Sequence, residues 1–306
     1  MLAELFKREY LASLERFALF YDDFAEYGAR DAPLAFYFVP GIDGVPGQIR
    51  FALPMLLRTV GHHIYVRSLH LEEFSAKRPI WEKFTPANID KKRERIVADL
   101  DGLAGRHEKL FVMCSSSGFY DFLSAYGELS AAVRERSALL WVAVAPDHFR
   151  SSPWESIFFR INGFVHGGHR WFAAPNHNWL RWVNPETTTS HTWRSGSTRK
   201  IFYKNDLESR LDLFGMQWSY NSLGAFNECL AHAIGRSRFP IDIPAFILVA
   251  TNDGYWQDRP ESDIDALLDQ YLSRKQVLRR RASHLWVLTP DNMRDLLELA
   301  RGSARH

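Results

Sequence analysis

A serine-rich segment of this 306-residue chain has the clearest capacity for chemistry. It reads Cys114-Ser115-Ser116-Ser117-Gly118, follows a short apolar run and precedes a helical pattern. A sharp strand-to-helix turn needs small residues two positions before and two after its central residue, because strand and helix pack closely there. Of the serines in this segment, only Ser116 meets that rule. Ser116 is therefore a candidate nucleophile, and a plain serine-rich turn is the alternative.

A serine hydroxyl is a weak nucleophile until a base removes its proton, and the pKa of histidine suits that task near neutrality. A carboxylate then fixes the tautomer of the imidazole. Asp253 follows an apolar run at 243–251, and His284 precedes a helical pattern at 290–301. Taken singly, these residues are an aspartate at a strand end and a histidine in a surface loop. Taken with Ser116 and in this order, they predict a catalytic triad.

These segments together resemble the α/β-hydrolase superfamily, and the short front end of the chain is similar to its thioesterase-type members. Cys114 stands where the motif usually has glycine, but it is also small. The resemblance implies the chain order nucleophile, acid, histidine, and so the roles of Ser116, Asp253 and His284. Asp147 is a rival acid because it also follows an apolar run, at 138–145. Asp253 is preferred because its flanking sequence matches the family better.

The resemblance also implies an oxyanion hole, a pair of backbone N–H donors for the negative oxygen of an acyl-transfer intermediate. One donor would be Ser117, which follows the nucleophile, and the other Ile42, in the loop after the first core strand. That loop begins Pro40-Gly41, as in the thioesterase-like branch, and a simple Gly/Pro turn is the alternative. The glycine spacing in this loop does not match a dinucleotide-binding fingerprint.

Alternating strand and helix patterns flank these residues. Short apolar runs bounded by turn residues predict strands at 34–39, 64–69, 109–113, 138–145 and 243–251, and the segment 277–281 is interpreted as the last strand. Apolar residues near helical spacing predict helices at 3–27, 51–60, 89–103, 119–129, 262–272 and 290–301. The alternation predicts an α/β fold with a mostly parallel central sheet and helices on both faces.

The pattern breaks between the two parts of the predicted core, 1–146 and 240–306. The intervening residues, 147–239, read as irregular and as an inserted cap rich in Trp, His, Asn, Ser and Arg. Its aromatic residues could line an acyl pocket, but a small core of the cap itself is the simpler interpretation. His166 and His169 lack a suitably spaced acidic or cysteine partner, so no metal site is expected. No cofactor is expected either.

Composition narrows the choice of partners and location. The net charge of +2 gives no reason to expect a nucleic acid or a membrane as partner. The pair of cysteines, Cys114 and Cys229, fits a reducing compartment, and the first residues do not form a signal peptide. No apolar run is long enough for a membrane helix, so the expected location is the cytoplasm.

Two basic runs have simple explanations. The run 91–95 is interspersed with acid and predicts a solvated helix face. The run 279–281 predicts an edge strand protected by charge, with attraction of an anionic substrate or a carrier protein as the alternative.

The sequence therefore predicts a serine hydrolase that cleaves an ester or thioester of a small or medium apolar acyl group through an acyl-enzyme. A carrier-protein-bound substrate is compatible with this hypothesis. The alternatives are acyl transfer or lyase chemistry on the same fold, and a non-catalytic ligand-binding homologue. The sequence specifies neither the substrate nor the oligomeric state.

Overall fold

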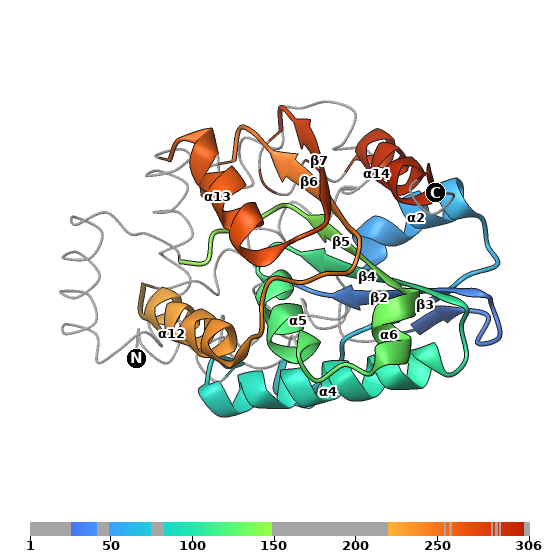
Figure 1. Cartoon of the computed structure of the whole chain (residues 1–306), viewed down its shortest axis with the longest axis horizontal. Coiled ribbons are helices and arrows are strands. Elements are labelled where there is room, and N and C mark those ends of the chain that lie inside the picture. Colours follow the sequence, from blue (N-terminus) through green and yellow to red (C-terminus); the bar gives the residue numbers. More distant parts are fainter. Residues whose placement is uncertain are drawn as a thin grey trace, which may run out of the picture.

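The computed structural model describes residues 26–41, 49–74, 83–148, 220–253, 255–256, 259–282, 284, 287 and 289–302. This part of the chain contains one sheet of 7 strands in the order β1-β3-β2-β4-β5-β6-β7 (Figure 1). The strands are β1 (Glu26–Gly28), β2 (Leu34–Val39), β3 (Tyr65–Ser68), β4 (Lys109–Ser115), β5 (Ser137–Val142), β6 (Ala245–Ala250) and β7 (Lys275–Arg280). Strand β1 is antiparallel to β3, and the other neighbouring pairs are parallel. The predicted mostly parallel sheet is confirmed.

Helices cover both faces of this sheet (Figure 1). They are α2 (Ile49–Val60), α4 (Pro86–Ala104), α5 (Gly118–Tyr126), α6 (Ala131–Arg136), α12 (Tyr220–Arg236), α13 (Glu261–Tyr271) and α14 (Pro290–Gly302), with a short 3-10 helix η2 (Glu72–Phe74). Helices α2 and α14 pack on one face, and α4, α5, α6, α12 and α13 pack on the other. Among the helices described, none is long and apolar enough to cross a membrane.

The central strands β2, β4, β5 and β6 are mostly apolar because both of their faces are covered. In β2, for example, Tyr37 joins the hydrophobic cluster on one side of the sheet and Phe36 joins the cluster on the other. Strand β7 lies at the edge, where Arg279 pairs with Asp265 and Arg280 pairs with Asp295. The predicted charged edge strand is confirmed.

Several predicted boundaries are wrong. The predicted helix at 119–129 ends earlier, because α5 stops at Tyr126 and Ser130 caps a separate helix by accepting a hydrogen bond from the Val133 N–H at 3.3 Å. The predicted strand at 138–145 is too long, because Ala143 adopts a φ of 54° after the end of β5. The predicted helix at 3–27 is wrong at its end, where β1 begins, and residues 3–25 lie outside the described residues.

The predicted irregular segment is also wrong in part. Residues 220–236 form the regular helix α12, which packs against α4 and α5. Residues 149–219 lie outside the described residues, and so do His166 and His169. The boundaries of an inserted cap at 147–239 stay a prediction.

Candidate active site

Ser116 occupies a strained turn between β4 and α5. Its φ is 52°, in the left-handed region that costs a residue with a side chain about 1–2 kcal/mol. Strand β5 holds this conformation through hydrogen bonds to both backbone groups of Ser116. The Ser116 N–H donates to the Val142 carbonyl at 2.8 Å, and the Ser116 carbonyl accepts from the Trp141 indole N–H at 2.8 Å. The turn is thus fixed by its neighbours and not by its own preference.

The residues that flank the turn explain the need for small side chains. A Cβ atom added at Gly118 would lie 2.5 Å from the carbonyl oxygens of both Val39 and Pro40, closer than such contacts allow. Cys114 lies in register between Val39 on β2 and Trp141 on β5, and it is fully buried. Glycine is therefore required on the helix side, whereas the strand side accepts a small thiol in the packed core.

The structure brings Ser116, Asp253 and His284 together. The Nε2 atom of His284 lies 2.8 Å from the Oγ atom of Ser116, and its Nδ1 atom hydrogen bonds with the Oδ2 atom of Asp253. The other carboxylate oxygen of Asp253 accepts the backbone N–H of Tyr255 at 2.9 Å. In neutral imidazole, Nδ1–H would donate to the carboxylate and Nε2 would accept the serine hydroxyl. This arrangement can move a proton from the hydroxyl to the imidazole.

The three side chains are shielded from solvent. Ser116, Asp253 and His284 are 8%, 3% and 6% exposed. A water-excluded environment strengthens charge interactions between such groups. The site therefore suits a reaction in which an imidazolium forms beside a carboxylate.

Two aromatic residues near Asp253 were missed by the sequence analysis. The ring of Tyr255 stands perpendicular to the imidazole of His284, with centroids 4.7 Å apart. The indole N–H of Trp256 donates to the Val144 carbonyl at 2.8 Å, which ties the loop after β6 to the loop after β5. The sequence indicated these residues only through their position next to Asp253. Their contacts could not be predicted, because residues in a loop follow no periodic pattern.

The rival acid Asp147 has a different partner. Its Oδ2 atom accepts the hydroxyl of Tyr271 at 3.5 Å. Burial and the Asp147 charge raise the pKa of Tyr271 to about 12, so the hydroxyl stays protonated and can donate. In the described residues, the carboxylate that hydrogen bonds with His284 belongs to Asp253.

Of the two predicted oxyanion donors, the structure describes the position of Ser117, and its role as a donor stays a prediction. Ser117 is the residue just before α5, where backbone N–H groups lack partners within the helix. Gly41 brings the loop after β2 against the turn, since a Cβ atom added there would lie 3.2 Å from the Cβ atom of Ser116. Ile42 itself lies outside the described residues, and its role stays a prediction.

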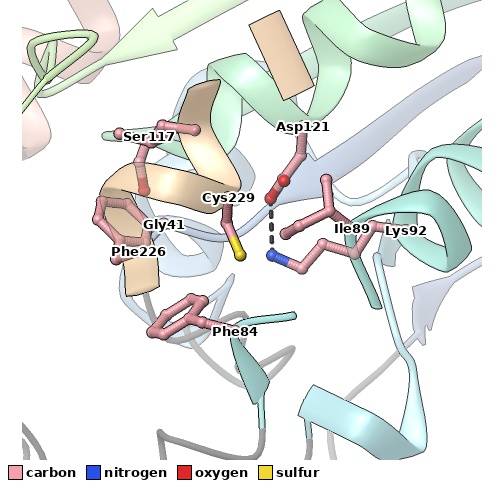
Figure 2. Close-up of a pocket in the computed structure, with 9 residues that line it drawn as sticks. Gly41, Phe84, Ile89, Lys92, Ser117, Asp121, Phe226 and Cys229 are labelled. Atoms are coloured by element: carbon pink, nitrogen blue, oxygen red, sulfur yellow. Dashed lines mark hydrogen bonds and ion pairs between the residues drawn. The ribbon is translucent and has the colours of Figure 1, made fainter. Parts of the chain in front are cut away.

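A small pocket adjoins the turn, and it contains a buried ion pair (Figure 2). The Nζ atom of Lys92 lies 2.7 Å from the Oδ2 atom of Asp121, and Lys92 is only 3% exposed. The predicted solvated face at 91–95 is therefore wrong at Lys92. Burial raises the pKa of Asp121, and the Lys92 ammonium partly offsets this effect.

The described residues contain no cluster of three or more His, Cys, Asp or Glu residues that could hold a metal ion. Both cysteines are buried and free. Burial raises the pKa of the Cys114 thiol well above its usual value and that of Cys229 to about 12. Neither thiol is therefore suited to act as a nucleophile near neutral pH.

Comparison with known proteins finds similarity at the level of structure. No family model matches the chain, and no curated protein matches its sequence. A 2-hydroxy-6-oxo-6-phenylhexa-2,4-dienoate hydrolase from Rhodococcus sp. strain RHA1 is 13% identical with a TM-score of 0.52, over 91% of this chain and 92% of its own. A laboratory-evolved potato epoxide hydrolase is 13% identical with a TM-score of 0.51, over 92% and 95%. A candidate aryl esterase from Burkholderia cenocepacia is 12% identical with a TM-score of 0.52, over 92% and 94%. These solved structures are α/β-hydrolases.

Proposed function

We propose that this chain, which has the α/β-hydrolase fold, is a serine hydrolase that cleaves an ester or thioester through an acyl-enzyme. The observation that carries the proposal is the buried chain of hydrogen bonds from Ser116 through His284 to Asp253. A hydroxyl held against a base that is itself oriented by a carboxylate is the arrangement for nucleophilic attack on an acyl carbon.

The reaction would proceed in two halves. Nε2 of His284 takes the proton of Ser116 as its Oγ atom bonds to the acyl carbon. The N–H groups of Ser117 and Ile42 stabilise the negative oxygen, and the intermediate then expels an alcohol or thiol, which takes the proton from the imidazole. A water molecule repeats these steps on the acyl-enzyme and releases the acid. Asp253 holds the imidazole in place and stabilises the imidazolium that forms.

The acyl group in this proposal is small or medium in size and mainly apolar. Phe84 and Phe226 line the small cavity that begins at Ser117, so the side chains near the candidate nucleophile include aromatic rings. The proposed substrates include acyl groups attached to a carrier protein. The proposal includes neither a nucleic acid nor a membrane as a partner. We place the enzyme in the cytoplasm, in line with its free cysteines.

A panel of aryl esters and acyl thioesters of increasing chain length tests the proposal. We expect turnover, with an initial burst of released alcohol that matches the amount of enzyme if hydrolysis of the acyl-enzyme is slow. The Ser116→Ala variant should lose both. A folded protein that turns over no member of the panel would contradict the proposal, and product formed only with an added acceptor would indicate acyl transfer. Ligand binding without turnover, unchanged in Ser116→Ala, would indicate a receptor.

A further inference from the structure

The peptide bond between Ser116 and Ser117 has a carbonyl that is bonded and an N–H that is available. Its carbonyl oxygen accepts the indole N–H of Trp141 at 2.8 Å, in a buried contact. Its N–H belongs to Ser117 and has no acceptor within the part of the chain that the structure describes. Ser117 is only 4% exposed. A buried N–H group of this kind needs an acceptor, and here a bound molecule can provide one.

Trp141 determines the direction of this N–H. A peptide bond is planar and trans, so its N–H points away from its carbonyl oxygen. The indole is itself held in place, because Trp141 is fully buried and stacks on Phe119 with ring centroids 3.8 Å apart and an interplanar angle of 12°. A fixed indole therefore fixes the carbonyl of Ser116, and the carbonyl fixes the N–H on the opposite side of the peptide bond.

The same hydrogen bond changes the strength of the N–H as a donor. Hydrogen bonds that are linked in a chain polarise one another, and each link is strengthened by about 10–30%. Here the links would be the indole N–H of Trp141, the peptide bond between Ser116 and Ser117, and an acceptor beside Ser117. The surrounding residues are buried, and a low local dielectric increases the energy of every link.

We infer that Trp141 is a positioning residue for the oxyanion hole, because its indole orients and polarises the peptide bond that contains the Ser117 N–H. This inference rests on the proposed function and deepens it, since it assigns a role to a residue buried beneath the site. The negative oxygen of the tetrahedral intermediate would accept the Ser117 N–H at the end of this chain. The benefit is largest when that charge forms, so it lowers the barrier more than it improves substrate binding.

Two changes at position 141 test this role. Trp141→Phe removes the indole N–H but also leaves a space in the core. Replacement of Trp141 by benzothienylalanine puts sulfur in the place of the N–H and keeps the size of the ring system, so it removes the hydrogen bond with little change in packing. Both variants should be less stable than the wild-type protein, because the Ser116 carbonyl loses a buried partner.

Tyr120→Phe is the matched control. The hydroxyl of Tyr120 donates to the Ala145 carbonyl at 2.9 Å, again in a buried contact. The residue after Ala145 is Pro146, so that peptide bond has no N–H to orient or polarise. The control therefore loses a comparable hydrogen bond to a buried carbonyl without any change at the Ser117 N–H.

Steady-state kinetics on one aryl ester give the first readout. We expect the benzothienylalanine variant to lose roughly 10-fold in kcat with little change in KM, because the lost interaction acts in the transition state. The loss should be smaller than the roughly 100-fold to 1,000-fold effect of removing an oxyanion donor, since the Ser117 N–H is still present. Trp141→Phe should lose at least as much, and Tyr120→Phe should keep the wild-type kcat.

The carbonyl stretch of the acyl-enzyme separates this role from a merely structural one. The acyl-enzyme is prepared with an isotope-labelled, slowly hydrolysed aryl ester, and infrared difference spectroscopy records its carbonyl. A weaker hydrogen bond from Ser117 should shift the stretch to higher wavenumber in the benzothienylalanine variant, whereas Tyr120→Phe should give the wild-type value. Displacement of the serine hydroxyl alone would slow acylation without this shift.

An unchanged stretch, or a wild-type kcat in the benzothienylalanine variant, would overturn the inference. A loss of kcat beyond roughly 1,000-fold would overturn it too, because the nucleophile itself would then be displaced. Failure of the proposed function is a distinct result, in which the wild-type protein cleaves no ester and forms no acyl-enzyme. That failure would overturn both.

Discussion

The Nε2 atom of His284 lies 2.8 Å from the Oγ atom of Ser116, although 168 positions separate the two residues in the chain. The contact depends on the sheet. Strands β4, β6 and β7 belong to its parallel part, so their carboxyl ends lie at the same edge. The segments that follow these strands carry Ser116, Asp253 and His284, respectively. The fold therefore assembles the candidate triad from residues far apart in the sequence.

The acid can be identified by paired variants. Asp253→Asn should lower kcat by a factor on the order of 10⁴, because an amide favours the wrong imidazole tautomer. Asp147→Asn should have a much smaller effect, since its partner is Tyr271. Steady-state rates on one aryl ester provide the comparison. Loss of turnover in Asp147→Asn alone would make Asp147 the acid.

Gly118 packs against the backbone carbonyls of Val39 and Pro40, so replacing it should cost more folding stability than replacing a glycine with open space around it. Gly118→Ala should lower the free energy of unfolding by about 1–3 kcal/mol or more, because its Cβ atom would meet two backbone carbonyls. Gly102→Ala on α4 is the control, since a Cβ atom there meets nothing within 4 Å. This control should gain about 0.5–1 kcal/mol from helix propensity. Equal effects in urea unfolding would contradict the account.

The indole of Trp256 should act on activity through the position of Asp253. Trp256→Phe removes the hydrogen bond to the buried Val144 carbonyl, at a cost of about 1–3 kcal/mol. If the loop after β6 shifts as a result, kcat should fall by roughly 10-fold or more while KM changes little. Kinetics and thermal unfolding measured on the same sample check this. A destabilised variant with unchanged kcat would limit Trp256 to a structural role.

The cysteines should resist alkylation in the folded protein. Burial raises the pKa of Cys229 to about 12 and that of Cys114 well above its usual value, so at pH 8 both remain protonated. Because the thiolate is the reactive form, iodoacetamide should modify neither residue at this pH. Denatured protein, where both should react, is the control. Rapid modification of Cys229 in the native state, detected by mass spectrometry, would show that α12 opens.

Much of the site follows from local patterns in the sequence. The residues around Ser116 are small because the backbone packs closely there. In the structure, Gly118 packs against the carbonyls of Val39 and Pro40. Strand β6 reads as an apolar run because both of its faces are covered, and Asp253 stands beyond its end. His284 follows the charged edge strand β7 and precedes the helical pattern of α14. Such features depend on near neighbours in the chain, so the sequence reveals them.

Other features depend on contacts between distant segments. Lys92 lies in a charged run that is typical of a solvated helix, but its partner Asp121 is on another helix. Helix α12 follows a long aromatic segment that obscures its periodicity. The contacts of Tyr255 and Trp256 arise only when the loops after β5, β6 and β7 meet. Composition and spacing carry no signal for such pairings.

Labelling with a fluorophosphonate probe is the most direct test of the central claim, that His284 activates the hydroxyl of Ser116. The probe bonds covalently to an activated serine, and peptide mass spectrometry locates the modified residue. We expect labelling of the wild-type protein at Ser116 alone, no labelling of Ser116→Ala, and strongly slowed labelling of His284→Ala. Folded wild-type protein that stays unlabelled, or that is labelled at another serine, would contradict the account.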